Sequence, residues 1–172
     1  MKVFSFMLIF FVFCGTSFAA EGDAKIGISG PVTLVDGAAY WGANSALEYS
    51  ISSRWSLGLD SGFFYRHKSY PGSTVSGWIL PLLPSVFYDP AMGTAVFHPY
   101  FGLGAGPVIL HNSLAVDSSP RIGFSDTSVK LEMLVHLAAT FGKKRRIFAD
   151  LRMGLLDGDF VFAPGVGWNF SL

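Results

Sequence analysis

Apolar and polar residues alternate along most of this chain, and a period of two predicts β-strands because neighbouring side chains of a strand point to opposite faces. The alternating segments are 25–34, 40–51, 54–65, 76–88, 97–109, 129–141, 147–155 and 160–172. No helical period lasts longer than a turn or two after residue 20. Pro81 and Pro84 would interrupt a ladder, so we expect a bulge or a kink in 76–88. The pattern predicts an all-β domain of eight antiparallel strands.

The N-terminal residues have the layout of a secretory signal peptide. A lysine precedes an apolar run over 3–13, and small residues follow. We expect residues 1–19 to be removed by cleavage after Ala19, or alternatively after Ala20. Residues 20–172 then form a single β-barrel domain.

Cys14 is the only cysteine in the chain, and it lies inside this predicted leader. A lipoprotein signal also ends at a cysteine, but bulky Phe13 stands where such a signal has a small residue. If Cys14 leaves with the leader, the mature chain has no disulfide and no thiol nucleophile.

The connections between the segments favour one topology. The first, third, fifth and seventh run near 35–38, 66–74, 110–128 and 156–159. The second, fourth and sixth run near 52–53, 89–95 and 142–146. Outer-membrane barrels keep short turns in the periplasm and longer loops outside, so this pattern favours an up-and-down transmembrane β-barrel. We expect the polar stretch 117–120 in the longest loop to be the exposed part.

Alternation alone does not say which face of a barrel is outside. A soluble lipocalin-like barrel turns its apolar face inward, whereas a membrane barrel turns it to lipid. Here the other face is mainly Gly, Ala, Ser and Asn, and charged residues are 14% of the chain, below the ~25% of soluble domains. No apolar stretch after residue 20 is long enough for a spanning helix, and a closed barrel is the other form that can span. We therefore expect the apolar face to meet lipid.

Aromatic side chains near the ends of the apolar face support the same interpretation. Trp55 and Tyr65 are ten residues apart in one segment, as are Trp78 and Tyr88 in the next. Ten residues of a tilted strand span about 25 Å, the height of the apolar band between two aromatic girdles. The predicted girdle residues are Trp41, Tyr49, Trp55, Tyr65, Trp78, Tyr88, Trp168 and Phe170.

Two motifs resemble the small opacity-type and OmpA-like barrels of the outer membrane. Residues 99–106, PYFGLGAG, look like the Pro-Tyr-x-Gly-x-Gly strand of that family, and 164–170, PGVGWNF, resemble its closing strand. The resemblance implies an outer-membrane location, contact with lipid and lipopolysaccharide, and recognition of the C-terminal strand by the barrel-assembly machinery. The chain departs from the family in ending on Leu172 rather than Phe. A closed barrel can be monomeric, and we expect a monomer.

Seven ionisable residues fall on the predicted inner face. They are Glu48, Asp60, Lys130, Glu132, His136, Asp150 and Arg152. They could form a polar path or a catalytic cluster. The simpler interpretation is a structural ion-pair network, because small barrels are filled by side chains and buried charges must be paired. We expect Glu132 or Asp150 to pair with Arg152 or Lys130.

Two tripeptides near strand ends, 67–69 (HKS) and 111–113 (HNS), resemble the His-x-Ser of a barrel enzyme that removes an acyl chain from lipid A. The rest of that motif is missing, and no acid that would orient either histidine can be named. His98 and His136 are too isolated for a metal site. We therefore predict no catalytic residues, no cofactor and no metal ligands.

The favoured function is an integral outer-membrane barrel with a structural or surface-interaction role. A lipid A acyl hydrolase and a soluble periplasmic binder of an apolar ligand stay open as alternatives. The formal net charge of zero gives no basis for nucleic-acid binding. The basic run 143–146 could contact anionic phospholipid headgroups.

Overall fold

The computed structural model describes residues 22–33, 39–90, 94, 96–117, 122–142 and 146–171, and side chains from residue 39 to residue 170 within those ranges. The predicted leader with Cys14, and the terminal Leu172, lie outside the described residues. No helix in the described part of the chain is long and apolar enough to cross a membrane.

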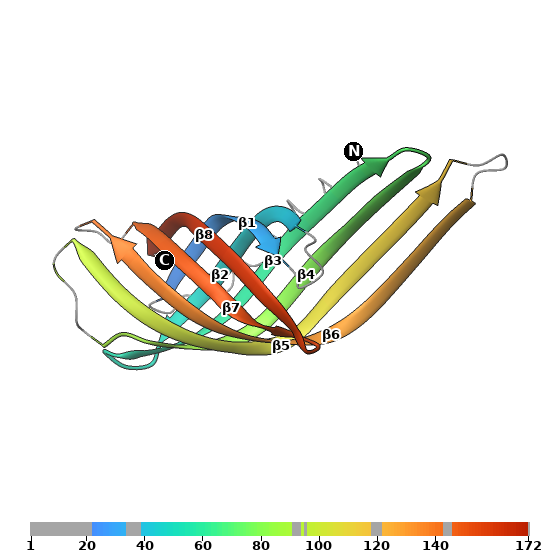
Figure 1. Ribbon diagram of the computed structural model, residues 1–172. Coiled ribbons are helices and arrows are strands. Elements are labelled where there is room, and N and C mark those ends of the chain that lie inside the picture. The colour runs from blue at the N-terminus through green and yellow to red at the C-terminus, as the bar shows by residue number, and fades with distance from the viewer. Residues whose placement is uncertain are drawn as a thin grey trace.

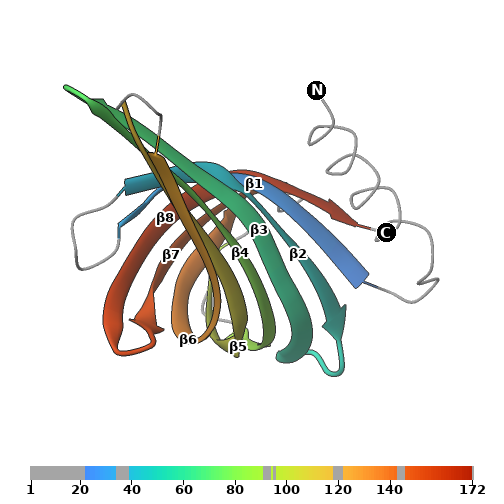
Figure 2. The same ribbon diagram turned by 90° about the vertical axis from the view of Figure 1, so that its right-hand side faces the viewer.

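The described chain is built from antiparallel strands joined in sequence order. The strands are β1 (Gly22–Thr33), β2 (Ala39–Ser50), β3 (Trp55–Tyr70), β4 (Ser73–Tyr88), β5 (Phe97–Val116), β6 (Ile122–Phe141), β7 (Ile147–Leu156) and β8 (Asp159–Ser171). Each pairs with the next, and β1 also pairs with β8 (Figure 1, Figure 2). The prediction of an all-β, antiparallel, up-and-down barrel is confirmed.

The prolines of β4 interrupt the ladder, as predicted, but without a bulge. Pro81 pairs with Val108 and Ser85 pairs with Gly104, so the register on β5 is the same on both sides of Pro84. The ladder omits the three residues between those pairs, because a proline cannot donate a hydrogen bond. A register shift appears in β1 instead, across Gly30 and Pro31.

Two connections predicted as long loops are strands. The segment predicted as loop 66–74 belongs to β3 and β4, which meet at a tight turn with Gly72 at φ 78°. In the region predicted as loop 110–128, β5 continues to Val116 and β6 begins at Ile122. Figure 1 shows these two hairpins extending beyond the ends of the other strands. The outer side of these hairpins is polar, whereas the outer side of the rest of the same strands is apolar, so a search for one continuous apolar face ends too early.

The barrel interior has an apolar part and a polar part. The apolar cluster is Tyr40, Phe64, Ile79, Leu83, Val108, Leu110, Leu134, Leu156, Val161 and Ala163. The buried polar residues are Asn44, Asp60, Ser85, Glu132, His136, Thr140, Asp150, Arg152 and Asn169. Along β3, β4, β7 and β8 the residues of the apolar cluster lie toward the end that carries the projecting hairpins, and the polar residues lie toward the other end, where Phe87 and Phe148 are also buried. Glu132, on β6, is an exception because it lies at the apolar level.

Candidate functional site: a buried charge cluster and a projecting sheet

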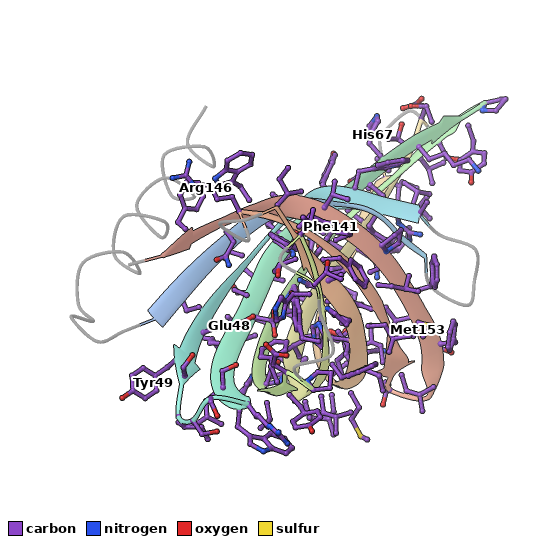
Figure 3. All side chains as sticks on the ribbon, turned by 90° about the vertical axis from the view of Figure 1, so that its left-hand side faces the viewer. Glu48, Tyr49, His67, Phe141, Arg146 and Met153 are labelled. Atoms are coloured by element: carbon purple, nitrogen blue, oxygen red, sulfur yellow. The ribbon has the colours of Figure 1, made fainter. Side chains whose placement is uncertain are left out.

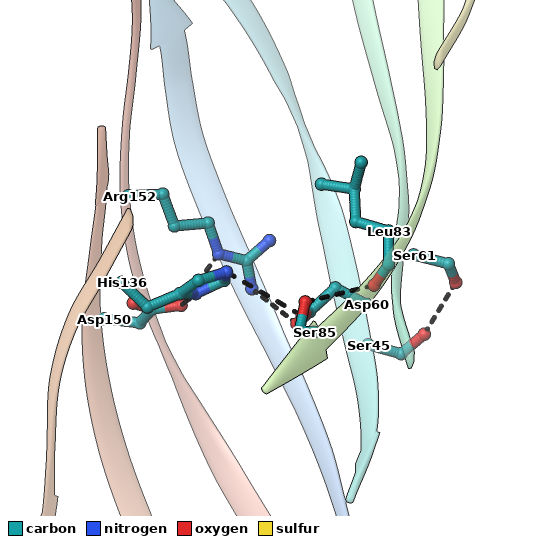
Figure 4. Close-up of polar contacts among 8 residues, drawn as sticks. All are labelled: Ser45, Asp60, Ser61, Leu83, Ser85, His136, Asp150 and Arg152. Carbon is teal, nitrogen blue, oxygen red and sulfur yellow. Dashed lines mark hydrogen bonds and ion pairs between the residues drawn. The ribbon is translucent and has the colours of Figure 1, made fainter. Parts of the chain in front are cut away.

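A buried charge cluster is centred on Arg152 of β7. The Arg152 Nε donates to Asp150 Oδ2 at 2.7 Å, and its guanidinium lies 3.8 Å from Asp60 Oδ1 (Figure 4). His136 Nδ1 lies 3.1 Å from the same Asp150 oxygen, and Ser85 Oγ donates to Asp60 Oδ2 at 2.6 Å. Because β3 supplies Asp60, β4 supplies Ser85 and β6 supplies His136, the cluster joins opposite walls of the barrel.

The structure brings together five of the seven residues predicted on the inner face. Asp60, Glu132, His136, Asp150 and Arg152 are buried. Of the expected ion pairs, Asp150 with Arg152 is present. Glu48 is half-buried and points to the inside of β2, whereas its neighbour Tyr49 points outward (Figure 3). Lys130 lies apart, because its Nζ pairs at 3.2 Å with Asp157 in the turn between β7 and β8.

Sequence reasoning missed Ser85 as a member of the cluster. Both faces of the segment 76–88 are rich in apolar residues and prolines, so the sequence pattern does not show which face points into the barrel. Ser85 is 4% exposed, and it takes its place in the cluster because it follows the same alternation as Leu83 and Phe87. A serine between two buried apolar residues was the available signal.

The buried cluster has the features of a structural core. Its cavity is about 10 Å³, lined by residues that include Asp60, Tyr100 and Arg152, and a single water needs about that much space. Ser85 donates its hydroxyl hydrogen bond to a carboxylate rather than to an imidazole, which is not the arrangement that activates a serine nucleophile. Among the described residues, no group of His, Cys, Asp and Glu is arranged to hold a metal ion.

Aromatic side chains form rows across the strands. The strand registers align Trp41 with Tyr65, Tyr65 with Trp78, and Trp78 with His111, whose ring stacks on Trp78 at 5.4 Å. We call these residues the upper row. Toward the other end of the barrel, pairing aligns Trp55 with Tyr88, Tyr88 with Phe101, and Ile147 with Trp168. Of the predicted girdle residues, Trp78 and Tyr88 are half-buried, and the exposed ones are Trp41, Tyr49, Trp55, Tyr65, Trp168 and Phe170.

Between these levels the outer face is apolar. Leu103 is 65% exposed, Val129 is 69% exposed and Leu131 is 61% exposed. Figure 3 shows Tyr49 and Met153 on the outside of the barrel. Such a continuous exposed apolar surface marks contact with a membrane or another protein.

Beyond the upper row, the polarity of the two faces is reversed. The outer face of this part carries His67, Ser69, Thr74, Ser76, Ser113 and Ser125. The inner face carries Tyr70, Val75, Leu114, Val116, Ile122 and Phe124, together with the polar residues Arg66, Lys68, Asn112 and Asp126. Phe124 is 63% exposed and Ile122 is 47% exposed. We call this four-stranded extension of β3, β4, β5 and β6 the projecting sheet.

The projecting sheet has two open edges within the described part of the chain. The pairing of β2 with β3 ends at Trp41 and Tyr65, and that of β6 with β7 ends at Glu132 and Leu156. Beyond these pairs, β3 is open over 66–70. β6 is open from Ile122 to Lys130, since the Leu131 carbonyl accepts from the Asp157 amide at 2.9 Å. The β6 edge is therefore the longer of the two.

Neither candidate His-x-Ser tripeptide forms a catalytic triad in the structure. Ser69 Oγ and His67 Nε2 are 3.5 Å apart on the surface of the projecting sheet. His111 Nδ1 is 2.8 Å from Thr127 Oγ1 rather than from Ser113. Among the described residues, no carboxylate contacts either imidazole, so the acid that orients the base in such enzymes has no counterpart.

Comparison with known proteins identifies the fold. No protein-family model matches the chain, and no curated protein matches it. The structure of Ail, the attachment invasion locus protein of Yersinia pestis, is similar with a TM-score of 0.60 and 15% identity, covering 89% of this chain and 100% of Ail. Neisserial surface protein A is also similar, with a TM-score of 0.53 and 14% identity, covering 88% of this chain and 96% of that protein. OprG of Pseudomonas aeruginosa is similar with a TM-score of 0.51 and 14% identity, covering 89% of this chain and 97% of OprG. The chain has the fold of the small outer-membrane β-barrel proteins, as its motifs predicted.

Proposed function

We propose that this protein is an integral outer-membrane barrel of eight strands that presents the projecting sheet at the cell surface as a protein-binding element. The observation that carries the proposal is the reversal of polarity at the upper row. Below it the outer face is apolar, and above it the outer face is rich in hydroxyl groups. A membrane boundary at the upper row explains why the outer face of each long strand is apolar on one side of the row and polar on the other. Trp and Tyr in this row agree with such a boundary, because both residues favour the membrane interface.

The exposed apolar surface supports a membrane barrel over the soluble alternative. A soluble lipocalin-like barrel keeps its large apolar residues inside around a ligand. Here Leu103, Leu131 and Met133 lie outside, while the inside holds the charge cluster and a packed apolar cluster. Removal of the predicted leader 1–19, assembly through the C-terminal strand, contact with lipopolysaccharide and a monomeric state belong to the same proposal.

The open edge of β6 supports a binding role for the projecting sheet. Unpaired backbone groups along an edge can pair with an extended segment of another polypeptide. The edge of β3 carries Arg66 and Lys68 within five residues, and charges of this kind discourage pairing. The open edge of β6 has Asp126 near its middle and Lys130 at its end, and its other residues are the uncharged run IGFS before Asp126 and TSV after it. The likeness to Ail, named for attachment and invasion, agrees with a surface role.

Labelling of single cysteines in intact cells tests the surface placement. The predicted mature chain has no cysteine of its own, so Ser125→Cys places one thiol on the projecting sheet. The matched control is Ser53→Cys, in the exposed turn between β2 and β3 at the other end. We expect a membrane-impermeant maleimide to label Ser125→Cys in intact cells and Ser53→Cys only after the outer membrane is permeabilised. Labelling of Ser53→Cys alone in intact cells would reverse the orientation.

Membrane insertion is tested independently by fractionation. We expect a detergent-extracted outer-membrane band whose mobility on an SDS gel changes on boiling, as for folded barrels. A soluble periplasmic band without a mobility shift would contradict the proposal and restore the lipocalin-like alternative. A lipid A deacylation assay with Ser69→Ala and Ser113→Ala checks the enzyme alternative, for which we expect no activity to lose.

A further inference from the structure

An apolar groove crosses the outer face of the barrel over β5, β6, β7 and β8. It has a volume of about 550 Å³, and its lining includes Pro99, Phe101, Ala139, Ala149, Leu151 and Val166. The strand registers align Pro99 with Ala139, Ala139 with Ala149, and Ala149 with Val166. The groove exists because alanines occupy the two central strands at a level where the adjacent rows carry larger side chains.

The row on one side of the groove lies at the end of the barrel where β6 meets β7. Phe97 pairs with Phe141, Phe141 with Ile147, and Ile147 with Trp168. The rings of Phe97 and Phe141 are 5.5 Å apart. Aromatic residues at such a level are typical of the boundary between hydrocarbon and headgroups.

A cation stands on the far side of this aromatic row. Arg146 directly precedes β7, is exposed, and points away from the barrel (Figure 3). Its backbone is fixed, because its carbonyl accepts from the Asn169 amide of β8 at 2.6 Å. In sequence it follows three further cations, residues 143–145, which lie outside the described residues.

The separation of Arg146 and the groove matches the dimensions of a lipid. Ala149 follows Arg146 by three residues, which is about 10 Å along a strand and roughly 8 Å along the membrane normal at a tilt of ~40°. The headgroup region of a bilayer is about 5–8 Å deep on each side of the hydrocarbon core. A cation at headgroup level therefore places Ala149 just inside the hydrocarbon.

We propose that this groove binds one acyl chain of an anionic phospholipid and that the phosphate of this lipid pairs with Arg146. The lipid belongs to the leaflet at the end of the barrel where β8 ends. The inference rests on the proposed membrane placement of the barrel. The positive charge decides between the possible occupants. A second copy of the chain would bring its own Arg146 to any symmetric contact here, and two like charges would repel. A negatively charged headgroup is instead attracted by each cation that it approaches.

Native mass spectrometry of the full-length protein, purified in detergent from membranes, tests this lipid site. The protein is incubated with an equimolar mixture of phosphatidylglycerol and phosphatidylcholine that have identical acyl chains. We expect the wild type to retain phosphatidylglycerol in preference to phosphatidylcholine. Arg146→Gln lowers that preference about fivefold, the effect of one cation at an anionic surface. Ala149→Phe fills the groove and removes retention of both lipids.

Ala105→Phe is the matched control, because Ala105 is an exposed alanine on the outer face of β5 away from the groove. It retains lipid as the wild type does. If Ala149→Phe does not fold, Ala139→Leu fills the same groove from β6. Equal retention by Ala149→Phe and Ala105→Phe would overturn the inference, and so would a wild type without preference for phosphatidylglycerol. A dimer that Ala149→Phe abolishes would assign the groove to a second copy and also overturn it.

The mobility shift on boiling separates this inference from the proposed function. A wild type that shifts on boiling but retains no lipid contradicts the lipid site alone. A wild type without a mobility shift contradicts the membrane placement on which both proposals rest.

Discussion

The lower and upper halves of β3, β4, β5 and β6 belong to the same strands but carry opposite patterns. In the barrel, the outer face is apolar and the inner face holds a packed core with a charge cluster. In the projecting sheet, the outer face is rich in hydroxyl groups and the inner face exposes apolar side chains. Since strand geometry is continuous across the boundary, the proposed membrane placement explains the change: lipid surrounds the barrel below the boundary, and water surrounds both faces above it. The alternation of apolar and polar residues along a strand therefore depends on the surroundings of each face.

The largest expected effect on stability comes from removing the cation of the buried charge cluster in the barrel. Arg152→Met leaves Asp60 and Asp150 buried without their cation, which should lower the free energy of unfolding by about 3–5 kcal/mol. Urea unfolding of the refolded protein, followed by tryptophan fluorescence, measures this loss. Lys130→Met is the control, because Lys130 and its partner Asp157 are both partly exposed, at 32% and 61%, and such pairs contribute at most about 1 kcal/mol. Equal effects of the two variants would show that the cluster is not a core element.

The same substitution at two phenylalanines, one in the barrel and one in the projecting sheet, tests the difference between these two regions. Phe64 of β3 is 3% exposed and belongs to the apolar cluster, whereas Phe124 of β6 is 63% exposed on the projecting sheet. Phe64→Ala should lower the free energy of unfolding by about 3–5 kcal/mol, and Phe124→Ala should change it by about 0.5 kcal/mol or less. Both are read from the urea midpoint at unchanged slope. A comparable loss in Phe124→Ala would mean that another part of the protein covers the inner face of the projecting sheet.

An introduced arginine distinguishes lipid from water on the outer face. Ala105 lies on the outer face near the middle of β5, between the levels of Phe101 and His111, so Ala105→Arg should cost about 2–4 kcal/mol in a bilayer. Ser125→Arg, on the outer face of the projecting sheet, should change stability by less than about 0.5 kcal/mol. Folding titrations into lipid vesicles measure both values. If the two arginines cost the same, the upper row does not mark a membrane boundary.

Amide hydrogen exchange along β6 should show a smaller contrast. Residues 133–140 are paired with both β5 and β7, whereas residues 122–130 are paired with β5 alone. We expect faster exchange in 122–130, because local opening there breaks fewer contacts. Uniform protection along the whole of β6 would indicate that the open edge is covered.

The fold class could be predicted because period-two alternation continues through every segment whose outer face is apolar. The inner positions of Asp60, His136, Asp150 and Arg152 followed from the same alternation. The pairing of Asp150 with Arg152 is one of the alternatives that the sequence predicted, because charges on a buried inner face must be paired. The contact of Arg152 with Asp60, 3.8 Å across the barrel, could not be derived, since it depends on how the barrel closes.

The projecting sheet escaped prediction for a physical reason. The serines and threonine at 113, 125 and 127 have the composition of a loop, yet they occupy the outer side of β5 and β6, whose inner side carries Leu114 and Phe124. The alternation is present there with its faces exchanged, so one continuous apolar face cannot be followed through it. Lys130 was placed in the interior network because its face is correct, but its height on β6 brings it to Asp157 in a turn.

Spin labels on single cysteines measure most directly whether the upper row marks the edge of the membrane. Labels are placed at Leu103→Cys and Ser125→Cys in the protein reconstituted into vesicles, and their collisions with oxygen and with a water-soluble nickel complex are compared. We predict that the label at 103 collides mainly with oxygen, which concentrates in hydrocarbon, and that the label at 125 collides mainly with nickel. Equal access of nickel to both positions would contradict the membrane placement of the barrel.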